Sequence, residues 1–148
     1  AFSEKLVVAS PGTELFLKNS DEVDHNIFVN DVASGVNFDL GLMPVGSELK
    51  KEIDWSQNSL VRIGCKIHPT MKAYIANIQA EHYQVIDFKK SQKEYQVRFD
   101  NIGGDEKVLK LLMSKFDPIE IALDAGESVK VDLMKKNKKK GELTVNIQ

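Results

Sequence analysis

Short apolar stretches alternate with clusters of turn-forming residues about every ten positions along this chain. Within a stretch, β-branched and aromatic side chains tend to occupy every second position, which is the spacing of a strand with one face on a core. Segments rich in Gly, Pro, Asn and Asp, such as Ser10-Pro11-Gly12, separate the stretches and favour turns. The pattern predicts an all-β fold, an antiparallel sandwich or barrel, with no helix longer than a turn or two.

The predicted strands fall into two groups on either side of residue 80. The first group is Lys5–Ala9, Glu14–Lys18, His25–Asn30, Asn37–Gly41, Ser47–Ile53, Ser59–Cys65 and Ala73–Gln79. The second group is Tyr83–Phe88, Tyr95–Asp100, Val108–Met113, Ile119–Leu123, Ser128–Leu133 and Glu142–Ile147. Turns are expected at Asn101–Gly104, at Asp124–Glu127 and at the lysine-rich Lys135–Gly141, which suits a solvated hairpin tip. We therefore divide the chain into residues 1–79 and residues 80–148.

Composition and charge exclude several classes of function. The 148 residues suffice for one medium domain, or for a small domain with an appendage, without disulfides to stabilise it. Because 20 basic residues nearly balance 22 acidic ones, no general affinity for nucleic acid or for an anionic membrane follows. No apolar run approaches the roughly 18 residues of a membrane span, and the only cysteine cannot form an intrachain disulfide. The first residue is Ala1 rather than Met, which is consistent with removal of an export signal or with trimming.

Four side chains that suit a metal ion occur in two short segments. Cys65, His68 and Met71 lie within seven residues, and His25 lies upstream in an apolar segment. One thiolate, two imidazoles and one weak thioether are the ligand set of a mononuclear electron-transfer copper site. Zinc suits the set less well, because zinc sites draw on Cys, His, Asp and Glu and would leave the methionine without a role.

Taken singly, each of these residues has an ordinary explanation. Cys65 ends an apolar run and would be a small buried hydrophobe. Met71 would fill the core, and His25 would be a hydrogen-bonded core or surface histidine. The four residues in this order favour copper over the separate explanations.

Residues 2–79 resemble the cupredoxins, the blue-copper family that includes plastocyanin, pseudoazurin and amicyanin. The resemblance rests on Phe2-Ser3, the strand–turn–strand segment 5–16, Asn19-Ser20-Asp21, His25-Asn26-Ile27-Phe28 and the loop Cys65–Met71. The two-residue gaps in that loop and the proline after its histidine are similar to the short ligand loop of amicyanin. The resemblance implies a Greek-key β-sandwich, residues 1–79, that binds one copper ion.

More of the chain resembles a narrower group, the periplasmic proteins labelled methylamine-utilisation proteins. In that group a smaller β-rich segment, like carboxypeptidase regulatory modules, follows the cupredoxin segment. The residues behind this likeness are 38–42, 61–68, 71–75, 97–102 and 125–132. The likeness implies an exported, periplasmic protein, and we infer no methylamine metabolism from it. Residues 80–148 are expected to be a β-rich appendage that packs on the first part or on a second chain and contributes no metal ligand.

Two features depart from the family pattern. Family members usually have a strand before the position of Phe2, so one edge of the sandwich is left to the second part or to another subunit. The residue after the cysteine is often Ser or Thr, whose hydroxyl ties the loop to the asparagine after the first histidine. Here it is Lys66, so any such tie to Asn26 is expected to use the backbone.

The resemblance implies an electron carrier rather than an enzyme. Copper would be held by His25, Cys65, His68 and Met71 and would pass between Cu(II) and Cu(I). Asn26 is expected to orient the ligands through hydrogen bonds from outside the ligand set.

An apolar rim around His68 is expected from Met43, Pro44 and Pro69. A redox protein, a cytochrome c or an oxidoreductase, would dock there in a small and transient encounter, and a homo-oligomer is also conceivable. Lys66 near that rim would favour an acidic partner, or would simply be solvated.

Two other classes of function use the same residues. A periplasmic copper-binding or tolerance protein would sequester copper through the same ligands without a dedicated electron-transfer partner. A nucleophilic enzyme could pair Cys65 with His68, but no oxyanion-hole motif or orienting third residue is evident. Copper explains the thiolate better.

Overall fold

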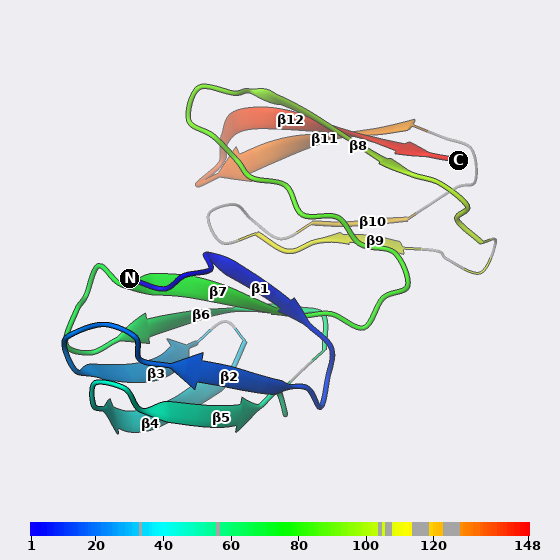
Figure 1. The fold of residues 1–148 in the computed structure, drawn as a ribbon. Helices are drawn as coiled ribbons and strands as arrows, with labels where there is room; N and C mark the ends of the chain where they lie inside the picture. The colour runs from blue at the N-terminus through cyan, green and yellow to red at the C-terminus, as the bar shows by residue number, and fades with distance from the viewer. Residues whose placement is uncertain (33, 56, 104, 106–107, 114–118, 123–127) are drawn as a thin grey trace. The chain divides into compact units, whose positions relative to one another are not determined.

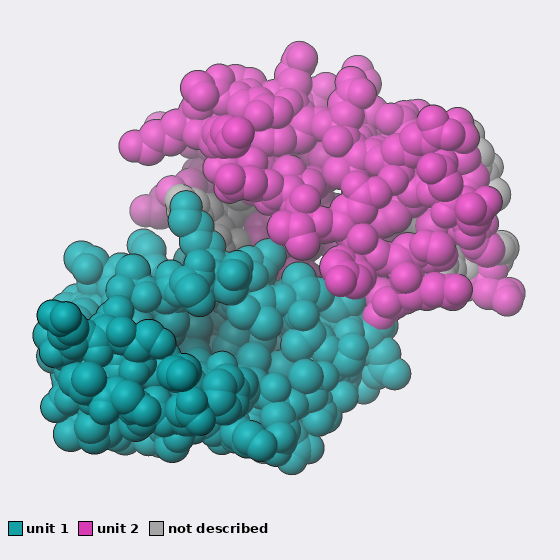
Figure 2. Space-filling view, viewed as in Figure 1, with its two compact units in different colours: residues 1–79 teal, residues 80–148 magenta. Residues whose placement is uncertain are grey.

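The computed structural model describes all residues except 33, 56, 104, 106–107, 114–118 and 123–127. The described residues form twelve β-strands and no α-helix, which confirms the predicted all-β class. No helix in this part of the chain is long and apolar enough to cross a membrane. The chain forms two compact units, residues 1–79 and residues 80–148 (Figure 2). This division falls at the same residue as the expected one.

The first unit contains two sheets (Figure 1). The larger sheet has the strand order β1-β7-β6-β3-β4, with β1 parallel to β7 and the other pairs antiparallel. Its strands are β1 (Leu6–Ala9), β3 (His25–Asp31), β4 (Val36–Met43), β6 (Ser59–Cys65) and β7 (Lys72–Asn77). The smaller sheet pairs β2 (Glu14–Lys18) with β5 (Glu48–Glu52). The chain therefore crosses between the two sheets four times, as in a sandwich.

The core of the first unit lies between these two sheets. Inward side chains of β3 and β6, such as Val29 and Val61, are fully buried and pack with Leu15 of β2. Buried positions alternate with less buried ones along β3, which is the period of two that the sequence shows. The core fixes β3 and β6 side by side, with His25 at the start of β3 and Cys65 at the end of β6.

A β-bulge interrupts β4. Asn26 pairs with Leu42, and Phe28 pairs with Asp39. Two residues of β4, Leu40 and Gly41, therefore lie opposite the single residue Ile27 of β3. Gly41 has a φ of 75°, a left-handed conformation that glycine adopts without steric cost. The extra residue reverses which positions face the core, from the even-numbered side chains before the bulge to Met43 after it.

The second unit also has two sheets around its own core. One sheet has the order β11-β12-β8, with β8 (Glu94–Phe99) parallel to β12 (Lys138–Ile147) and β11 (Ser128–Lys135) antiparallel to it. The other pairs β9 (Val108–Leu111) with β10 (Ile119–Ala122). The core is built from Tyr95, Val131, Leu133, Leu143, Val145 and Ile147.

The lysine-rich segment is a hairpin tip, as expected. Lys136 and Asn137 form its turn with φ values of 49° and 60°, which match the twist of the flanking strands. The turn is shorter than expected, because Lys138 already begins β12 and pairs with Lys135. The predicted turn Asp124–Glu127 lies outside the described residues, as does Gly104 of the predicted turn Asn101–Gly104.

The predicted strand Tyr83–Phe88 is wrong. This segment belongs to no sheet, although Ile86 and Phe88 do pack against the second core. Directly after the segment, the Tyr95 hydroxyl accepts a hydrogen bond from the Lys89 N–H at 3.0 Å. The alternation of apolar residues identified the inward face correctly but carried no information about a backbone partner.

Candidate metal centre

The pairing of β3 with β6 brings two distant parts of the chain together. Because the strands are antiparallel, the start of β3 lies beside the end of β6. His25 is the first residue of β3 and Cys65 is the last residue of β6, and both are buried. A separation of 40 residues along the chain is thereby reduced to direct contact.

The loop between β6 and β7 adds the second histidine. His68 begins a β-turn in which the Met71 N–H donates to the His68 carbonyl at 2.9 Å. Pro69 occupies the second position of this turn, where its fixed φ is favourable. Met71 ends the turn and packs against the core of the first unit.

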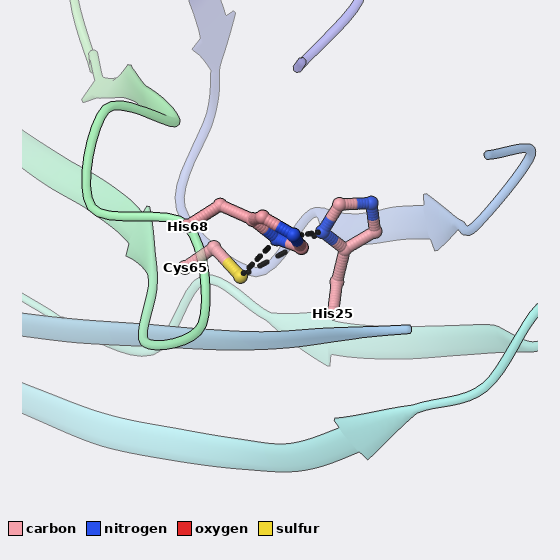
Figure 3. Close-up of side chains that lie close together, drawn as sticks. All are labelled: His25, Cys65 and His68. Atoms are coloured by element: carbon pink, nitrogen blue, oxygen red, sulfur yellow. Dashed lines mark hydrogen bonds between the residues drawn. The ribbon is translucent and has the colours of Figure 1, made fainter. Parts of the chain in front are cut away.

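Three donor atoms converge at this point. The Cys65 Sγ lies 3.6 Å from the Nδ1 of His25 and 3.6 Å from the Nδ1 of His68. The two Nδ1 atoms are 3.1 Å apart. Figure 3 shows the sulfur and both imidazole rings pointing toward one another. These three residues are the group of His, Cys, Asp and Glu side chains that could hold a metal ion in the part of the chain that the structure describes, with their donor atoms within 4.8 Å of one another.

A carboxylate holds the far side of the His25 ring. The Nε2 of His25 lies 2.8 Å from the Oδ2 of Asp21, so Nε2 carries the proton of that hydrogen bond and Nδ1 is left to face the sulfur. Asp21 is in turn placed by the buried Asn19, whose Oδ1 accepts the Asp21 N–H at 3.1 Å. Such an outer carboxylate fixes the tautomer and raises the basicity of a metal-binding histidine.

The Cys65 thiol is poised to ionise. Burial disfavours the thiolate, but the Asn26 N–H, the His25 ring, and the backbone and ring of His68 outweigh burial and lower the pKa of Cys65 to about 6. Burial also disfavours the His25 cation, yet its contacts with Cys65 and Asp21 leave the pKa of His25 raised. The contact with His25 lowers the pKa of Asp21. At neutral pH the site therefore offers a soft thiolate in contact with two histidine rings.

Asn26 contacts the sulfur through its backbone. Its N–H points to the Cys65 Sγ at 3.4 Å, and its carbonyl accepts the Lys66 N–H at 2.9 Å. The tie between the loop and Asn26 thus uses the backbone, as the lysine at this position predicts. The Asn26 amide donates to the Asp39 carboxylate at 2.6 Å, and Asp39 also pairs with the Lys66 ammonium. The Lys66 ammonium, the Gly41 N–H and the Asn26 amide, in this order of strength, lower the pKa of Asp39 to about 2.

The expected rim is only partly correct. Met43 is 2% exposed and belongs to the core, because the bulge in β4 turns its side chain inward. Pro44 and Pro69 are exposed, as the rim requires. The exposed apolar residues beside them are Leu42, Val45 and Ile67, which sequence reasoning missed.

Asp21 and Asp39 were also missed. Both lie within 15 residues of His25 in the sequence, but nothing in their spacing indicates that they contact the site. Lys66 is paired with Asp39, so its charge is not simply available to a partner.

No family model matches the chain. No curated protein matches it. Among solved structures, a purple cupredoxin from Nitrosopumilus maritimus is similar with 22% identity over 52% of this chain and 80% of its own, at a TM-score of 0.44. Several variants of amicyanin are also similar to this chain.

Two further solved structures that are similar to this chain are also copper proteins by their names. An amicyanin variant in its reduced Cu(I) form is 13% identical over 53% of this chain and 72% of its own, at a TM-score of 0.45. A copper-containing nitrite reductase from Thermus scotoductus SA-01 is 22% identical, over 53% of this chain and 20% of its own, at a TM-score of 0.44. The convergence of donor atoms from His25, Cys65 and His68, rather than these likenesses, indicates a metal site.

Proposed function

We propose that residues 1–79 bind one copper ion through His25, Cys65, His68 and Met71, and that the protein carries single electrons between redox partners. The observation that supports this most directly is the convergence of a low-pKa thiol with two imidazole nitrogens, all within 4.8 Å. Copper bound there would supply the one-electron Cu(II)/Cu(I) couple.

The chemistry of the donors fits copper. A thiolate and neutral imidazoles suit both oxidation states, and a thioether is a weak axial donor that copper sites use. The hydrogen bond from His25 to Asp21 leaves the other ring nitrogen free to coordinate. Met71 ends the His68 turn and packs against the core, and its thioether would be the weak fourth donor to copper.

The scaffold keeps the donors in one arrangement. His25 and Cys65 extend from adjacent strands whose inward side chains are close to fully buried, so neither backbone shifts easily. His68 is held by a proline-containing turn. A rigid donor set changes little when the charge of the bound ion changes, and little rearrangement is what rapid electron exchange requires.

We assign a carrier rather than an enzyme. Four protein donors would leave the ion no open position for a substrate, whereas catalytic metal sites keep one open. The exposed residues Leu42, Val45 and Ile67, together with Pro44 and Pro69, give a redox protein such as a cytochrome c or an oxidoreductase an apolar surface for brief docking. Export to the periplasm, implied by the sequence resemblance, belongs to the same proposal.

One spectrum tests the copper proposal. The oxidised, copper-loaded protein should show an intense visible band from charge transfer between the Cys65 thiolate and Cu(II), with one copper per chain. Substituting Cys65→Ser should abolish this band, because a hydroxyl cannot replace the thiolate as donor. A variant that keeps the band would remove Cys65 from the site and overturn the proposal.

Electron self-exchange separates a carrier from a storage protein. A carrier should exchange electrons rapidly between oxidised and reduced copies, which line broadening in nuclear magnetic resonance measures. Tight retention of Cu(I) with very slow exchange would favour a copper-binding or tolerance protein instead.

A further inference from the structure

Asp39 lies at the centre of a group of polar contacts beside Cys65. Its Oδ1 accepts hydrogen bonds from the Asn26 amide at 2.6 Å and from the Gly41 N–H at 2.9 Å. Its other oxygen, Oδ2, pairs with the Lys66 ammonium. One carboxylate therefore connects β3, β4 and the loop that follows Cys65.

The bulge in β4 is what brings Asp39 into this position. The pairing of β4 with β3 shifts register between Asp39 and Leu42. Gly41 supplies the left-handed backbone conformation that the bulge needs. The Gly41 N–H then turns back to the Asp39 carboxylate and fixes its direction. Bulges commonly serve to re-aim a side chain beside a functional site.

Asn26 connects this group to the sulfur. Its side chain is held by Asp39, while its N–H points to the Cys65 Sγ at 3.4 Å. Its carbonyl accepts the Lys66 N–H at 2.9 Å, and the Lys66 ammonium lies over the Phe28 ring at 5.8 Å. Lys66 is thus held through its backbone by Asn26 and through its side chain by Asp39.

We propose that Asp39 and Lys66 form a clamp that positions the Asn26 N–H against the Cys65 sulfur and thereby tunes the proposed copper site. This inference rests on the proposed function, and it assigns Asp39 and Lys66 as positioning residues that do not touch the metal. A hydrogen bond to the sulfur withdraws charge from the thiolate and favours Cu(I), so hydrogen bonding around the cysteine sets the potential of such a site.

An isolated surface ion pair would not have this effect. Lys66 and Asp39 are half exposed, and exposed pairs contribute little to stability. The clamp differs because three donors converge on one carboxylate, and because one of those donors belongs to the residue that contacts the sulfur. Lys18 and Glu48 form a pair of similar exposure in the same unit, between β2 and β5, and serve as the matched control.

The clamp and a simple charge effect predict opposite results for Asp39→Ala. If Asp39 acted only through its negative charge, its removal would favour Cu(I) and raise the reduction potential. If it acts through the clamp, its removal loosens the N–H contact to the sulfur and lowers the potential. Lys66→Met lowers the potential in both cases, so Asp39→Ala is the deciding variant. High ionic strength screens the exposed charges and leaves the clamp effect.

The first experiment uses metal-free protein and does not depend on copper. Amide hydrogen exchange of Asn26 should accelerate about threefold or more in Asp39→Ala and in Lys66→Met, because the contact that protects this amide is loosened. Lys66→Arg, which retains the cation, and Glu48→Gln, which breaks the control pair, should leave the Asn26 exchange rate unchanged. Equal exchange in Asp39→Ala and the parent protein would overturn the clamp.

The second experiment measures the potential of the copper-loaded variants at high ionic strength. Asp39→Ala and Lys66→Met should both lower it, and the double variant should show less than the sum of the two shifts, because both act on one contact. A raised potential in Asp39→Ala would overturn the clamp in favour of a charge effect. If the parent protein forms no copper–thiolate complex, the proposed function fails, and the exchange experiment still decides whether the clamp exists.

Discussion

The two units share a design but differ in where they place polar side chains. Each has a larger and a smaller sheet around one apolar core. In the first unit the structure buries three polar residues, Asn19, His25 and Asn77, and it brings His25 against Cys65 and His68. In the second unit the buried residues are apolar apart from the hydroxyl of Tyr95, within the residues that the structure describes.

The ionic groups of the second unit form exposed pairs instead. Lys139 contacts Asp132 at 2.7 Å and Glu142 at 3.2 Å, and these carboxylates raise the pKa of Lys139. In the described residues of this unit, no group of three potential metal donors is found. A strand framework of this kind can therefore exist with or without a metal site, and the residues at the strand ends determine whether a site is present.

The separate cores predict separate unfolding, which gives the largest expected effect. Leu143 of the second core and Ile53 of the first are both 1% exposed, and truncation of either to Ala should cost about 2–5 kcal/mol. Trp55 is the only tryptophan, so its fluorescence follows the first unit alone. Ile53→Ala should lower the fluorescence midpoint, and Leu143→Ala should leave it in place. Equal shifts in the two variants would show that the appendage packs on the first unit and unfolds with it.

The pH dependence of stability should also distinguish the units. Cys65 has a folded-state pKa of about 6 against the usual 9.0, so its thiolate stabilises the metal-free first unit above pH 9 and the effect is lost as the pH falls through 6. The difference corresponds to at most roughly 4 kcal/mol. The raised pKa of His25 acts in the opposite direction, since its contribution is complete below pH 6.5 and is lost as the pH rises.

The free energy of unfolding of the metal-free first unit should therefore rise with pH most clearly in the upper part of the window between pH 6 and pH 9. Denaturant unfolding followed by Trp55 fluorescence measures it, and Cys65→Ala should remove the slope. Thiolate absorbance in the ultraviolet gives the pKa directly. A Cys65 that titrates near 9.0 would contradict the expectation.

Substitution of Asp21 should have a smaller effect, a loss of affinity for copper. Asp21→Asn keeps the size of the side chain but weakens its hold on the Nε2 of His25. Loss of such an outer partner costs about 10–100-fold in metal affinity, which competition with a copper chelator measures. Asp132→Asn breaks an exposed ion pair in the second unit and should not change the affinity. Unchanged affinity in Asp21→Asn would mean that the turn and the core alone orient His25.

The axial position should give the smallest effect. Met71→Leu should keep copper bound through the three stronger donors but should raise the reduction potential, because a weak donor that helps Cu(II) is removed. Met134→Leu in the second unit makes the same chemical change away from the site and should leave the potential unchanged. Loss of copper from Met71→Leu would make Met71 a principal ligand, and an unchanged potential would remove it from the site.

The sequence was sufficient for features that depend on local patterns. Strand positions follow from alternation and turn residues, and β2 and β6 have the predicted bounds. His25, Cys65 and His68 were found because their side chains are chemically unusual together, and the structure brings all three into contact.

Features that depend on register were not predictable in the same way. The bulge at Gly41 adds one residue to β4 and so turns Met43 into the core, whereas uninterrupted alternation would have placed it on the surface. The contact of Asp39 with Asn26 arises from the same bulge. Tyr83–Phe88 shows the reverse case, in which alternation is present but no strand lies beside it.

The burial of Cys65 also determines how the protein responds to thiol reagents. Its side chain is 3% exposed and it is the only cysteine in the chain, so two molecules cannot bring their sulfurs to the roughly 2 Å of a disulfide bond while the site is folded. A preparation kept in air should therefore form no disulfide-linked dimers. A bulky alkylating reagent reaches the sulfur only when the segment after β6 opens, so the rate of alkylation in metal-free protein reports how often that segment opens.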